Sequence, residues 1–542
     1  MGQEFSTIDY ISFILYIVLI LGIALWVSRE KKGHKKDSSD YFLAGKALPW
    51  WAIGTSLIAS NISAEQFIGM SGSGYAIGLA IASYEWMSAA ALLIIAKFFM
   101  PIFLKKKIYT MPQFLELRYD NRVRTVLSVL WLLLYIFVNL TSVLYLGSLA
   151  LNTIMGIPLL YGILGLAIFA GLYSIYGGLK SVAWTDFIQV AFLIGGGLIT
   201  TYVALSAVAD QYGVSGPLAG LVEMFHQFPN KFDMILEKGQ IMVPDGQGGT
   251  RDAFKDIPGI SVLVGGLWIA NFFYWGFNQY VIQKGLAAKN IKEAQRGLAF
   301  AGYLKLLVPL IVVVPGIAAY VLSSGDLSPS DKAYPFVLQL VPVGVRGIAF
   351  AALVAAIIST LAAILNSTST IFTMDIYKHF INKDLSETNT VRMGRMASFT
   401  ALVIGVLVAR PLLGQLDQAF QFIQDFTGYI TPGVVVIFIG GLLWRRATPN
   451  AALWIAILTI PFSLVIDTLL PGTPFMNRIG YVAVALAVVF VLISQFELKK
   501  AGKEAHEKGI QIYTGLFSTG NVFNVMAIGI LAILAVLYIF LW

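Results

Sequence analysis

The chain has 542 residues, of which 58% are hydrophobic and 12% are charged, and its formal net charge is +8. Soluble domains are about 25% charged and the mean hydropathy here is +0.78, so the composition excludes an ordinary soluble protein and indicates a polytopic membrane protein. The absence of cysteine excludes disulfides, thiolate metal sites and thiol catalysis.

Apolar runs long enough to cross a membrane recur along the whole chain. A helix needs about 20 residues to cross the hydrocarbon. No cleavage site follows the first run, so we expect it to be a retained span. The sequence predicts an all-α fold with fourteen transmembrane helices. They are expected at 8–28, 47–78, 80–106, 125–151, 157–178, 182–208, 258–283, 297–323, 343–380, 392–413, 418–444, 449–470, 476–495 and 522–541.

The loops between these spans alternate in positive charge. If the N-terminus lies outside the cytoplasm, most of the 37 lysines and arginines fall in cytoplasmic loops, as the positive-inside rule requires. An even number of spans then places both termini outside. Membrane orientation accounts for the net charge, so no nucleic-acid partner is needed to explain it.

The second span contains SAEQFIGMSGSGYAIG, from Ser63 to Gly78. A helix breaks at membrane depth only where protein or a water-filled cavity can satisfy its backbone, so this stretch indicates a binding site. Close helix packing is the alternative explanation of the glycines, but it does not explain Glu65 and Gln66. Glu65 suits either a ligand contact or a structural ion pair in a vestibule.

Polar and aromatic residues at helical spacing recur in four later spans. Each pair taken alone suits a helix-to-helix hydrogen bond as well as a ligand contact. Together they supply carboxylate, amide, hydroxyl, ammonium and aromatic groups, and this set suits a neutral polyhydroxy molecule. They are Tyr84, Glu85 and Ser88 in span 3, Asn271 and Tyr274 in span 7, Lys305 in span 8, and Phe420 and Gln424 in span 11.

Span 9 carries two adjacent hydroxyl residues, Ser359 and Thr360, in an apolar run. Such hydroxyls can complete a shell of backbone carbonyls around Na⁺. The alternative is that each bonds back to a carbonyl of its own helix, and these two residues alone favour that alternative.

Enzyme functions gain little support. All four histidines, His34, His226, His379 and His506, lie in loops or at their edges, so no intramembrane histidine relay or zinc site is expected. Phosphate-binding P-loop and dinucleotide-binding patterns are also missing. Secondary transport is the function class that remains.

Longer stretches are more specific: SAEQFIGMSGSGYAIGLAIASYEWMSA, YIFVNLTSVLYLG, GGLWIANFFYWGFNQY, LNSTSTIFTMDIY and AFQFIQDFTGYITPG. Together they resemble the sodium/solute symporter family, most of all its bacterial sodium/galactose (sodium/glucose) cotransporter branch. The resemblance implies a LeuT-type core of two inverted five-helix repeats with discontinuous spans 2 and 7. The implied division is a peripheral span and cytoplasmic loop in 1–46, repeat one in 47–208, an extracytoplasmic loop in 209–257, repeat two in 258–444 and peripheral spans in 445–542.

The resemblance also implies a function. It is sodium-coupled symport of galactose, and of glucose as a second sugar, into the cell by alternating access, in the bacterial inner membrane with both termini extracytoplasmic. No enzyme activity and no cofactor are implied, with Na⁺ as the coupling ion and the sugar, Na⁺ and the lipid bilayer as partners. The preferred sugar and the oligomeric state stay open.

The family motifs assign roles to individual positions. The implied sugar contacts are Gln66, Glu85, Ser88, Asn271, Lys305 and Gln424, with Tyr274 stacking on the ring as the cytoplasmic-side gate. The implied external gate is Met70, Tyr84 and Phe420. The implied sodium ligands are the carbonyls of Ala59, Ile62 and Ala356 with the hydroxyls of Ser359 and Thr360, and Asp186 matches a position associated with sodium release.

Two features of span 9 bear on the ion. Thr360 stands where the branch usually has serine, so the hydroxyl is kept and a methyl is added. In some relatives, as the resemblance implies, a second ion is held by an acidic residue at the Asp186 position and by hydroxyls one turn beyond Ser359, where this chain has Ala362 and Ala363. We therefore expect one sodium per sugar. The alternatives are a symporter for another solute, such as proline, pantothenate or a sialic acid, and a sensor that uses the transporter fold.

Overall fold

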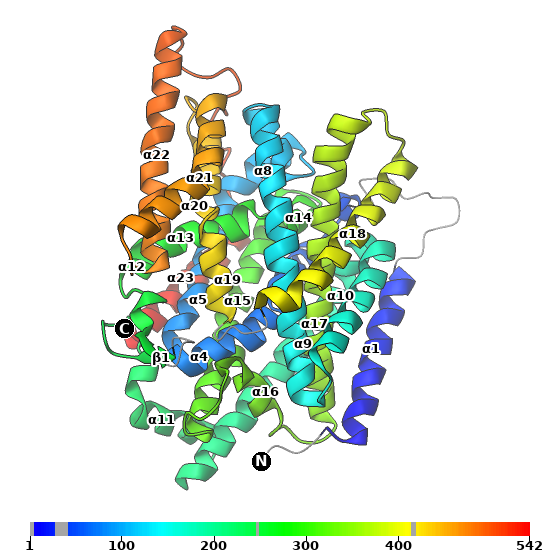
Figure 1. The fold of residues 1–542 in the computed structure, drawn as a ribbon, viewed down its shortest axis with the longest axis vertical. Coiled ribbons are helices and arrows are strands. Elements are labelled where there is room, and N and C mark those ends of the chain that lie inside the picture. The colour runs from blue at the N-terminus through cyan, green and yellow to red at the C-terminus, as the bar shows by residue number, and fades with distance from the viewer. Residues whose placement is uncertain (1–4, 28–41, 245–248, 414–418) are drawn as a thin grey trace.

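The computed structural model describes residues 5–27, 42–244, 249–413 and 419–542, and this part of the chain is almost entirely helical (Figure 1). The elements before residue 245 are α1 (Thr7–Val27), η1 (Ala44–Lys46), α3 (Trp50–Asn61), η2 (Glu65–Met70), α4 (Ser71–Ile77), η3 (Leu79–Ala82), α5 (Ser83–Ile94), η4 (Ile95–Phe99), α6 (Met100–Lys106), α7 (Met111–Arg118), α8 (Asn121–Leu134), η5 (Tyr135–Leu140), α9 (Thr141–Met155), α10 (Leu159–Tyr212), α11 (Pro217–Gln227), η6 (Pro229–Lys231) and β1 (Met242–Pro244).

The elements after residue 248 complete the fold. They are β2 (Thr250–Asp252), η7 (Ala253–Lys255), α12 (Ser261–Val264), α13 (Gly266–Asn271), η8 (Phe272–Phe277), α14 (Gln279–Leu286), α15 (Ile291–Leu322), η9 (Ser330–Lys332), α16 (Ala333–Leu338), α17 (Val345–Ile371), η10 (Phe372–Ile381), α18 (Glu387–Leu413), α19 (Ala419–Gly428), α20 (Thr431–Leu443), α21 (Pro449–Leu469), α22 (Phe475–Lys500) and α23 (Asn521–Phe540). Strands β1 and β2 pair antiparallel.

Nine helical segments of the described residues are long and apolar enough to cross a membrane. They are Leu79–Lys106, Asn121–Met155, Val182–Tyr212, Ile291–Leu322, Val345–Ile381, Glu387–Ala409, Pro449–Leu469, Phe475–Lys500 and Asn521–Phe540. Shorter apolar helices occupy Thr7–Ile20, Leu159–Leu172 and Thr431–Leu443. The predicted spans at 47–78 and 258–283 appear in neither group, because both are interrupted.

The first interruption separates α3 from η2 and α4. Helix α3 ends at Asn61, and Ile62 turns to extended backbone with φ −74° and ψ 98°. The Ser63 amide, which an unbroken helix would direct to the Ala59 carbonyl, instead donates to Oε1 of Gln66 at 3.2 Å. The break therefore frees a carbonyl at the end of α3.

The second interruption has nearly the same backbone geometry. Asn278 takes φ −78° and ψ 118° between the π-helical turn η8 and helix α14. A further break at Gly265 separates α12 from α13. The predicted spans 2 and 7 are thus discontinuous, as the family resemblance implied.

Three other predicted spans differ from a simple single helix. The spans expected at 157–178 and 182–208 lie in one helical segment, α10, whose 54 residues would extend about 81 Å if straight. That length exceeds the roughly 30 Å of hydrocarbon more than twofold, and α10 carries two separate apolar parts. The span expected at 418–444 is divided into α19 and α20.

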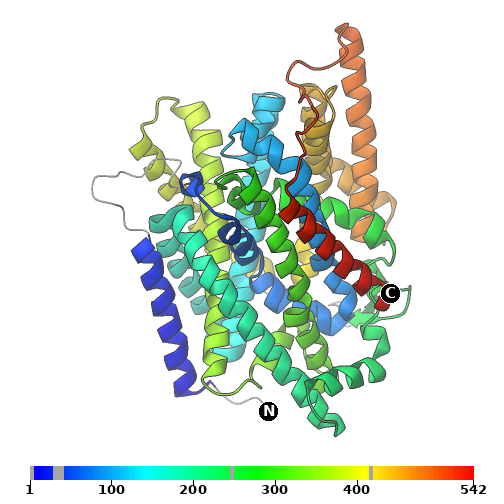
Figure 2. The same cartoon turned by 180° about the vertical axis from the view of Figure 1, so that it is seen from behind.

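Helix α17 lies at the centre of the molecule. In its most apolar window 94% of the residues are buried, against 17% in α23, and α17 packs against α10, α1, α18 and α3. Helix α1 lies at one edge and α22 and α23 at the opposite edge (Figure 2). The core that positions the site is therefore built from α3, α10, α15 and α17.

The loop between α10 and α12 contacts the end of α4 through hydrogen bonds. Lys231 Nζ donates to the carbonyls of Tyr75 at 2.9 Å and Ala76 at 2.7 Å, where the helix dipole favours a cation. Gly78 follows with φ +94°, and a Cβ there would lie 2.4 Å from the Lys231 carbonyl oxygen. Burial lowers the pKa of Lys231 to about 8.

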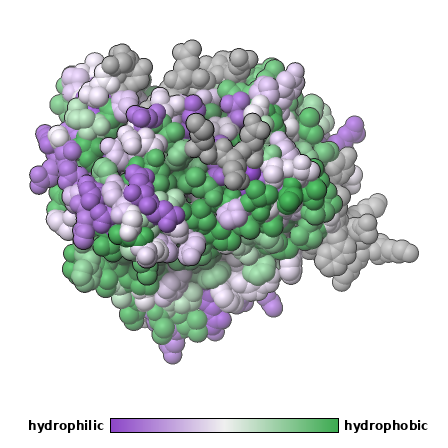
Figure 3. All heavy atoms as spheres, turned by 90° about the horizontal axis from the view of Figure 1, so that it is seen from below, coloured by the Kyte–Doolittle hydropathy of each residue, from purple (hydrophilic) through white to green (hydrophobic). Residues whose placement is uncertain are grey.

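Figure 3 shows the end of the molecule that carries α11 and α16, where hydrophilic and hydrophobic side chains form separate patches.

Candidate functional site

A small polar cavity lies where the two interrupted spans meet α5, α15 and α19. Its volume is about 40 Å³. Most of the predicted sugar-contact and gate residues line it, together with residues that the sequence did not single out for this role. The lining residues are Asn61, Glu65, Gln66, Tyr84, Glu85, Leu267, Ala270, Asn271, Tyr274, Trp275, Lys305, Phe420 and Gln424.

A buried charge pair forms one wall of the cavity. Lys305 on α15 makes an ion pair with Glu85 on α5, and its ammonium also donates to Oδ1 of Asn61. The Lys305 Nζ lies 4.9 Å from the centre of the Trp275 ring. Because each partner compensates the other, neither leaves an unpaired charge in the membrane. The pair presents both a donor and an acceptor beside the cavity.

Tyr274 forms a second wall. Its phenol oxygen accepts from Nδ2 of Asn61 at 3.0 Å and from the hydroxyl of Tyr280 at 3.0 Å. The Tyr274 ring packs edge-on against Trp275 at 5.1 Å. A flat aromatic face is therefore held in place between the end of α3 and the start of α14.

The two predicted amide contacts are fixed by their own segments. Asn271 Nδ2 donates to the Leu267 carbonyl one turn earlier, at 3.0 Å. Gln66 accepts from the Ser63 amide. Each side chain therefore keeps part of its hydrogen-bonding capacity for a ligand in the cavity.

Aromatic rings close the side of the cavity formed by α5 and α19. The rings of Tyr84 and Phe420 meet edge to face, with centroids 5.2 Å apart. The Tyr84 hydroxyl is buried and has no hydrogen-bond partner among the described residues. Gly69 of η2 packs directly on Phe420, since a Cβ at that glycine would lie 2.9 Å from the phenylalanine Cβ.

Two predicted residues do not line the cavity. Ser88 donates to the backbone carbonyl of Glu85 at 2.6 Å, which is the local bond that a serine commonly makes in a membrane helix. Met70 is fully buried at the end of η2. Both lie close in sequence to cavity residues, on the same elements.

Two of the predicted sodium residues, Thr360 and Ala59, meet beside the first interruption. Thr360 Oγ1 donates to the Ala59 carbonyl at 3.2 Å, so α17 meets the carbonyl that the break in α3 frees. Ile62 and Ala356 are also fully buried. Hydroxyls and free carbonyls are the ligands that a small hard cation requires.

Asp186 lies next to these residues. It accepts hydrogen bonds from the hydroxyls of Ser359 on α17 and Ser56 on α3. The carboxylate is fully buried and interacts electrostatically with the equally buried Lys284. Ser359 thus bonds to a neighbouring helix, and the expectation of bonding only within its own helix does not hold for it.

Sequence reasoning missed Asn61 and Trp275 as lining residues. Asn61 is the last residue of α3, and an asparagine immediately before a helix break is a signal that could have identified it. Trp275 sits next to Tyr274 in an aromatic run where neighbours are hard to distinguish. Glu65 lines the cavity and accepts from the Ser142 hydroxyl at 2.8 Å, with no ion pair to it found among the described residues.

Comparison with known proteins identifies a family profile and several relatives that match this chain. The sequence profile of the sodium:solute symporter family matches residues 41–459. The sodium/glucose cotransporter of Vibrio parahaemolyticus is 52% identical, with 99% of this chain and 98% of that protein aligned. The sodium/myo-inositol cotransporter 2 of Mus musculus is 34% identical over 84% of this chain and 69% of that protein.

Solved structures show the same fold. A Na⁺-coupled sialic acid symporter in a substrate-bound outward-open state superposes with a TM-score of 0.76 at 22% identity, covering 91% of this chain and 98% of that one. The transporter Mhp1 of the nucleobase-cation-symport-1 family, in a closed conformation, superposes with a TM-score of 0.56 at 14% identity, covering 85% and 96%.

The interrupted spans and the buried polar cavity between them define a membrane transporter. This chain belongs to the sodium:solute symporter family. Membership confirms the resemblance expected from the sequence motifs, and it confirms that the protein is a transporter and not an enzyme.

Proposed function

We propose that the protein carries galactose, and glucose as a second sugar, into the cell together with Na⁺ by alternating access. The observation that carries the proposal is the cavity between the two interrupted spans. A neutral sugar needs many donors and acceptors together with an apolar surface for its ring, and this cavity supplies a carboxylate, an ammonium, amides and aromatic faces. The similarity to a sodium/glucose cotransporter supports the same substrate class.

The lining side chains have distinct proposed roles. Tyr274 stacks on the sugar ring and closes the cytoplasmic side, while Met70, Tyr84 and Phe420 close the external side. The cavity is small, about 40 Å³, and we propose that these side chains move apart to admit a sugar. The proposed hydrogen-bonding set is Gln66, Glu85, Ser88, Asn271, Lys305 and Gln424, with Asn61 as a further member.

The proposed sodium site combines the carbonyls of Ala59, Ile62 and Ala356 with the hydroxyls of Ser359 and Thr360. Asp186 would receive the ion on its way to the cytoplasm, because its carboxylate already bonds to the hydroxyl of Ser359. We propose one sodium per sugar. The positions one turn beyond Ser359 are Ala362 and Ala363, and neither has a side-chain oxygen to hold a second ion.

The proposed architecture has fourteen spans, in two inverted repeats at 47–208 and 258–444, with both termini outside the cytoplasm of a bacterial inner membrane. The first residues of α1 and the last residues of α23 lie in the same half of the molecule in Figure 1, which supports an even number of spans. Single cysteines at Gln3, outside the described residues, and at Lys500 should react from opposite sides with an impermeant reagent. Reaction of both from one side would contradict this topology.

Other solutes remain alternatives within the family. The relatives include transporters named for myo-inositol and sialic acid, and a sensor with this fold is the alternative outside transport. The ammonium of Lys305 is already paired with Glu85. The described residues that line the cavity therefore offer no unpaired cation to a carboxylate such as that of sialic acid, and this favours a neutral solute.

The substrate class is tested by binding. Purified protein at saturating Na⁺ is incubated with labelled galactose, and unlabelled galactose, glucose, myo-inositol, proline and sialic acid are added as competitors. We expect galactose and glucose to displace the label at the lowest concentrations. Displacement by proline or sialic acid at lower concentrations than either sugar would overturn the proposal.

A further inference from the structure

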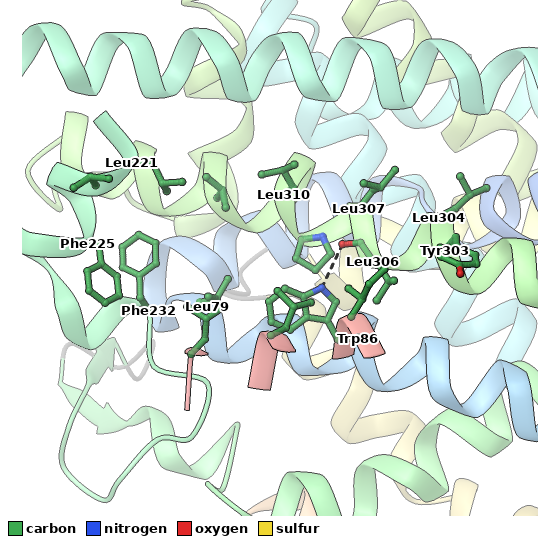
Figure 4. A pocket seen from close by; sticks show the side chains of 16 residues that line it. Leu79, Trp86, Leu221, Phe225, Phe232, Tyr303, Leu304, Leu306, Leu307 and Leu310 are labelled. Carbon is green, nitrogen blue, oxygen red and sulfur yellow. Dashed lines mark hydrogen bonds between the residues drawn. The ribbon is translucent and has the colours of Figure 1, made fainter. Parts of the chain in front are cut away.

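An apolar groove runs along the outside of the molecule, on the reverse side of the helices that carry the charge pair. Its volume is about 710 Å³, and its wall has almost no polar surface. Figure 4 shows Leu304, Leu307 and Leu310 in a row along α15, with Phe225 and Phe232 gathered at one end. The other lining residues are Leu79, Trp86, Leu221, Val222, Tyr303, Leu306, Pro309, Val314, Ile533, Leu537 and Leu541.

The location of the groove indicates which medium surrounds it. Two of its walls are α15 and α23, both long and apolar enough to cross the membrane. Leu307 and Leu310 are 39% and 38% exposed in the protein alone, so this face of α15 lacks a protein partner among the described residues. At this depth the surrounding medium is lipid hydrocarbon.

Helix α11 marks the level at which the groove ends. Leu218, Val222 and Phe225 lie at i, i+4 and i+7 and are 76%, 54% and 45% exposed, so they form one apolar stripe on a short helix of the loop at 209–257. A short amphipathic helix with an exposed apolar stripe lies in the membrane interface. The groove therefore starts at the interface, where lipid head groups are found, and continues inward along α15.

We propose that this groove holds one acyl chain of a membrane lipid as a bound chain with its head group at the level of α11. A wall with almost no polar surface cannot hold a sugar or a peptide backbone, because their polar groups would lose hydrogen bonds to water. A hydrocarbon chain has no hydrogen bonds to lose there, and it packs against the apolar side chains by van der Waals contact. The groove differs from a flat lipid-facing surface because four elements, α5, α11, α15 and α23, surround the chain.

The bound chain contacts the back of the sugar cavity. Trp86 in the groove follows Glu85 directly, and its indole nitrogen donates to the Leu306 carbonyl at 3.4 Å (Figure 4). Leu304 and Leu306 flank Lys305. The chain therefore supports the two helices that hold the Lys305–Glu85 pair, and this link to transport rests on the proposed function above.

The test fills the groove. In Leu307→Trp the larger side chain occupies the space of the chain, and Leu537→Trp fills it from the opposite wall. The matched control is Val403→Trp, which fills a second apolar groove between α10 and α18, where Val403 is 41% exposed. All proteins are exchanged into detergent, depleted of loosely held lipid, mixed with phosphatidylethanolamine or phosphatidylglycerol, and examined by native mass spectrometry.

We expect the wild type and Val403→Trp to retain one phospholipid, and both groove fillers to retain it at least tenfold less. If only one filler folds, that folded variant gives the answer. Absence of a retained lipid on the wild type, or equal loss in Val403→Trp, would overturn the site. Lipid retention is measured without transport, so failure of the sugar proposal leaves this outcome unchanged. In proteoliposomes the fillers should slow sugar uptake at least threefold, and unaltered uptake would overturn the link to the cavity.

Discussion

The side-chain amide of Asn61 donates a 3.0 Å hydrogen bond to the phenol oxygen of Tyr274, and this bond joins the two interrupted spans. Asn61 is the last residue of α3, and Tyr274 lies in η8, just before the break at Asn278. The same asparagine accepts from Lys305. Tyr274, which we propose as the gate, and the charge pair of the cavity are therefore linked through one side chain, so movement of either should affect the other.

Removal of the Tyr274 hydroxyl should loosen the gate while keeping its ring. In Tyr274→Phe the stacking surface remains, but Asn61 and Tyr280 lose their shared partner. Two hydrogen bonds are lost, at about 1 kcal/mol each, so galactose exchange in counterflow should become about 30-fold faster. Tyr274→Ala, which also removes the ring, should weaken sugar binding. Unchanged exchange in Tyr274→Phe would show that the hydroxyl does not restrain the gate.

Removal of the Asn271 amide should weaken sugar binding and leave Na⁺ binding unchanged. Asn271→Ala leaves a polar group of the bound sugar without its partner, which costs about 1–3 kcal/mol, or roughly 5- to 150-fold in the dissociation constant. Galactose binding at saturating Na⁺ measures the effect. Asn450→Ala, at an exposed position far from the cavity, is the control. Equal affinity in both variants would remove Asn271 from the site.

The hydroxyls of Ser359 and Thr360 on α17 should affect Na⁺ binding. Ser359→Ala should raise the Na⁺ concentration for half-maximal galactose uptake while the protein stays folded. Thr360→Ser keeps the hydroxyl that donates to the Ala59 carbonyl and should behave like the wild type, whereas Thr360→Ala should not. If Ser359→Ala and the wild type require the same Na⁺ concentration, Ser359 is not a ligand.

The free energy of unfolding should depend on pH in the alkaline range because Lys231 is buried. Burial lowers its pKa to about 8, while an unfolded lysine titrates near pH 10.4. Between these values the unfolded chain binds more protons at this site, so its contribution to the free energy of unfolding rises with pH. The difference in melting temperature between wild type and Lys231→Met should therefore change from pH 8 to pH 10. Lys238→Met, an exposed lysine of the same loop, should show no such change, and a parallel pair of curves for Lys231→Met would contradict the account.

The sequence predicted the interruptions better than the contacts across them. Glycine and polar residues inside apolar runs are local signals, so the breaks at 62–64 and near 276–278 could be anticipated. The partners of Lys305 could not, because Glu85 lies 220 positions away and only the packing of α5 on α15 brings them together. Span boundaries in α10 were also inaccessible, since hydropathy marks two apolar parts but does not show whether the backbone between them stays helical.

The charge of the loops predicts their orientation but not their local structure. Positive charge predicts which loops face the cytoplasm, and this stays a prediction. It did not show that Lys231, in a loop assigned to the opposite side, reaches back to the end of α4. That contact depends on the tertiary position of η6, which no local pattern encodes.

Coupled flux measures the central claim most directly. One Na⁺ crossing 100 mV supplies about 2.3 kcal/mol, and a tenfold Na⁺ gradient adds about 1.4 kcal/mol. The sum of about 3.7 kcal/mol supports roughly 500-fold accumulation of a neutral sugar. Proteoliposomes with an inward Na⁺ gradient should therefore concentrate labelled galactose above the external level, with a ratio of Na⁺ to galactose flux near one. Equal uptake with K⁺ in place of Na⁺ would contradict coupling, and a flux ratio near two would contradict a single ion site.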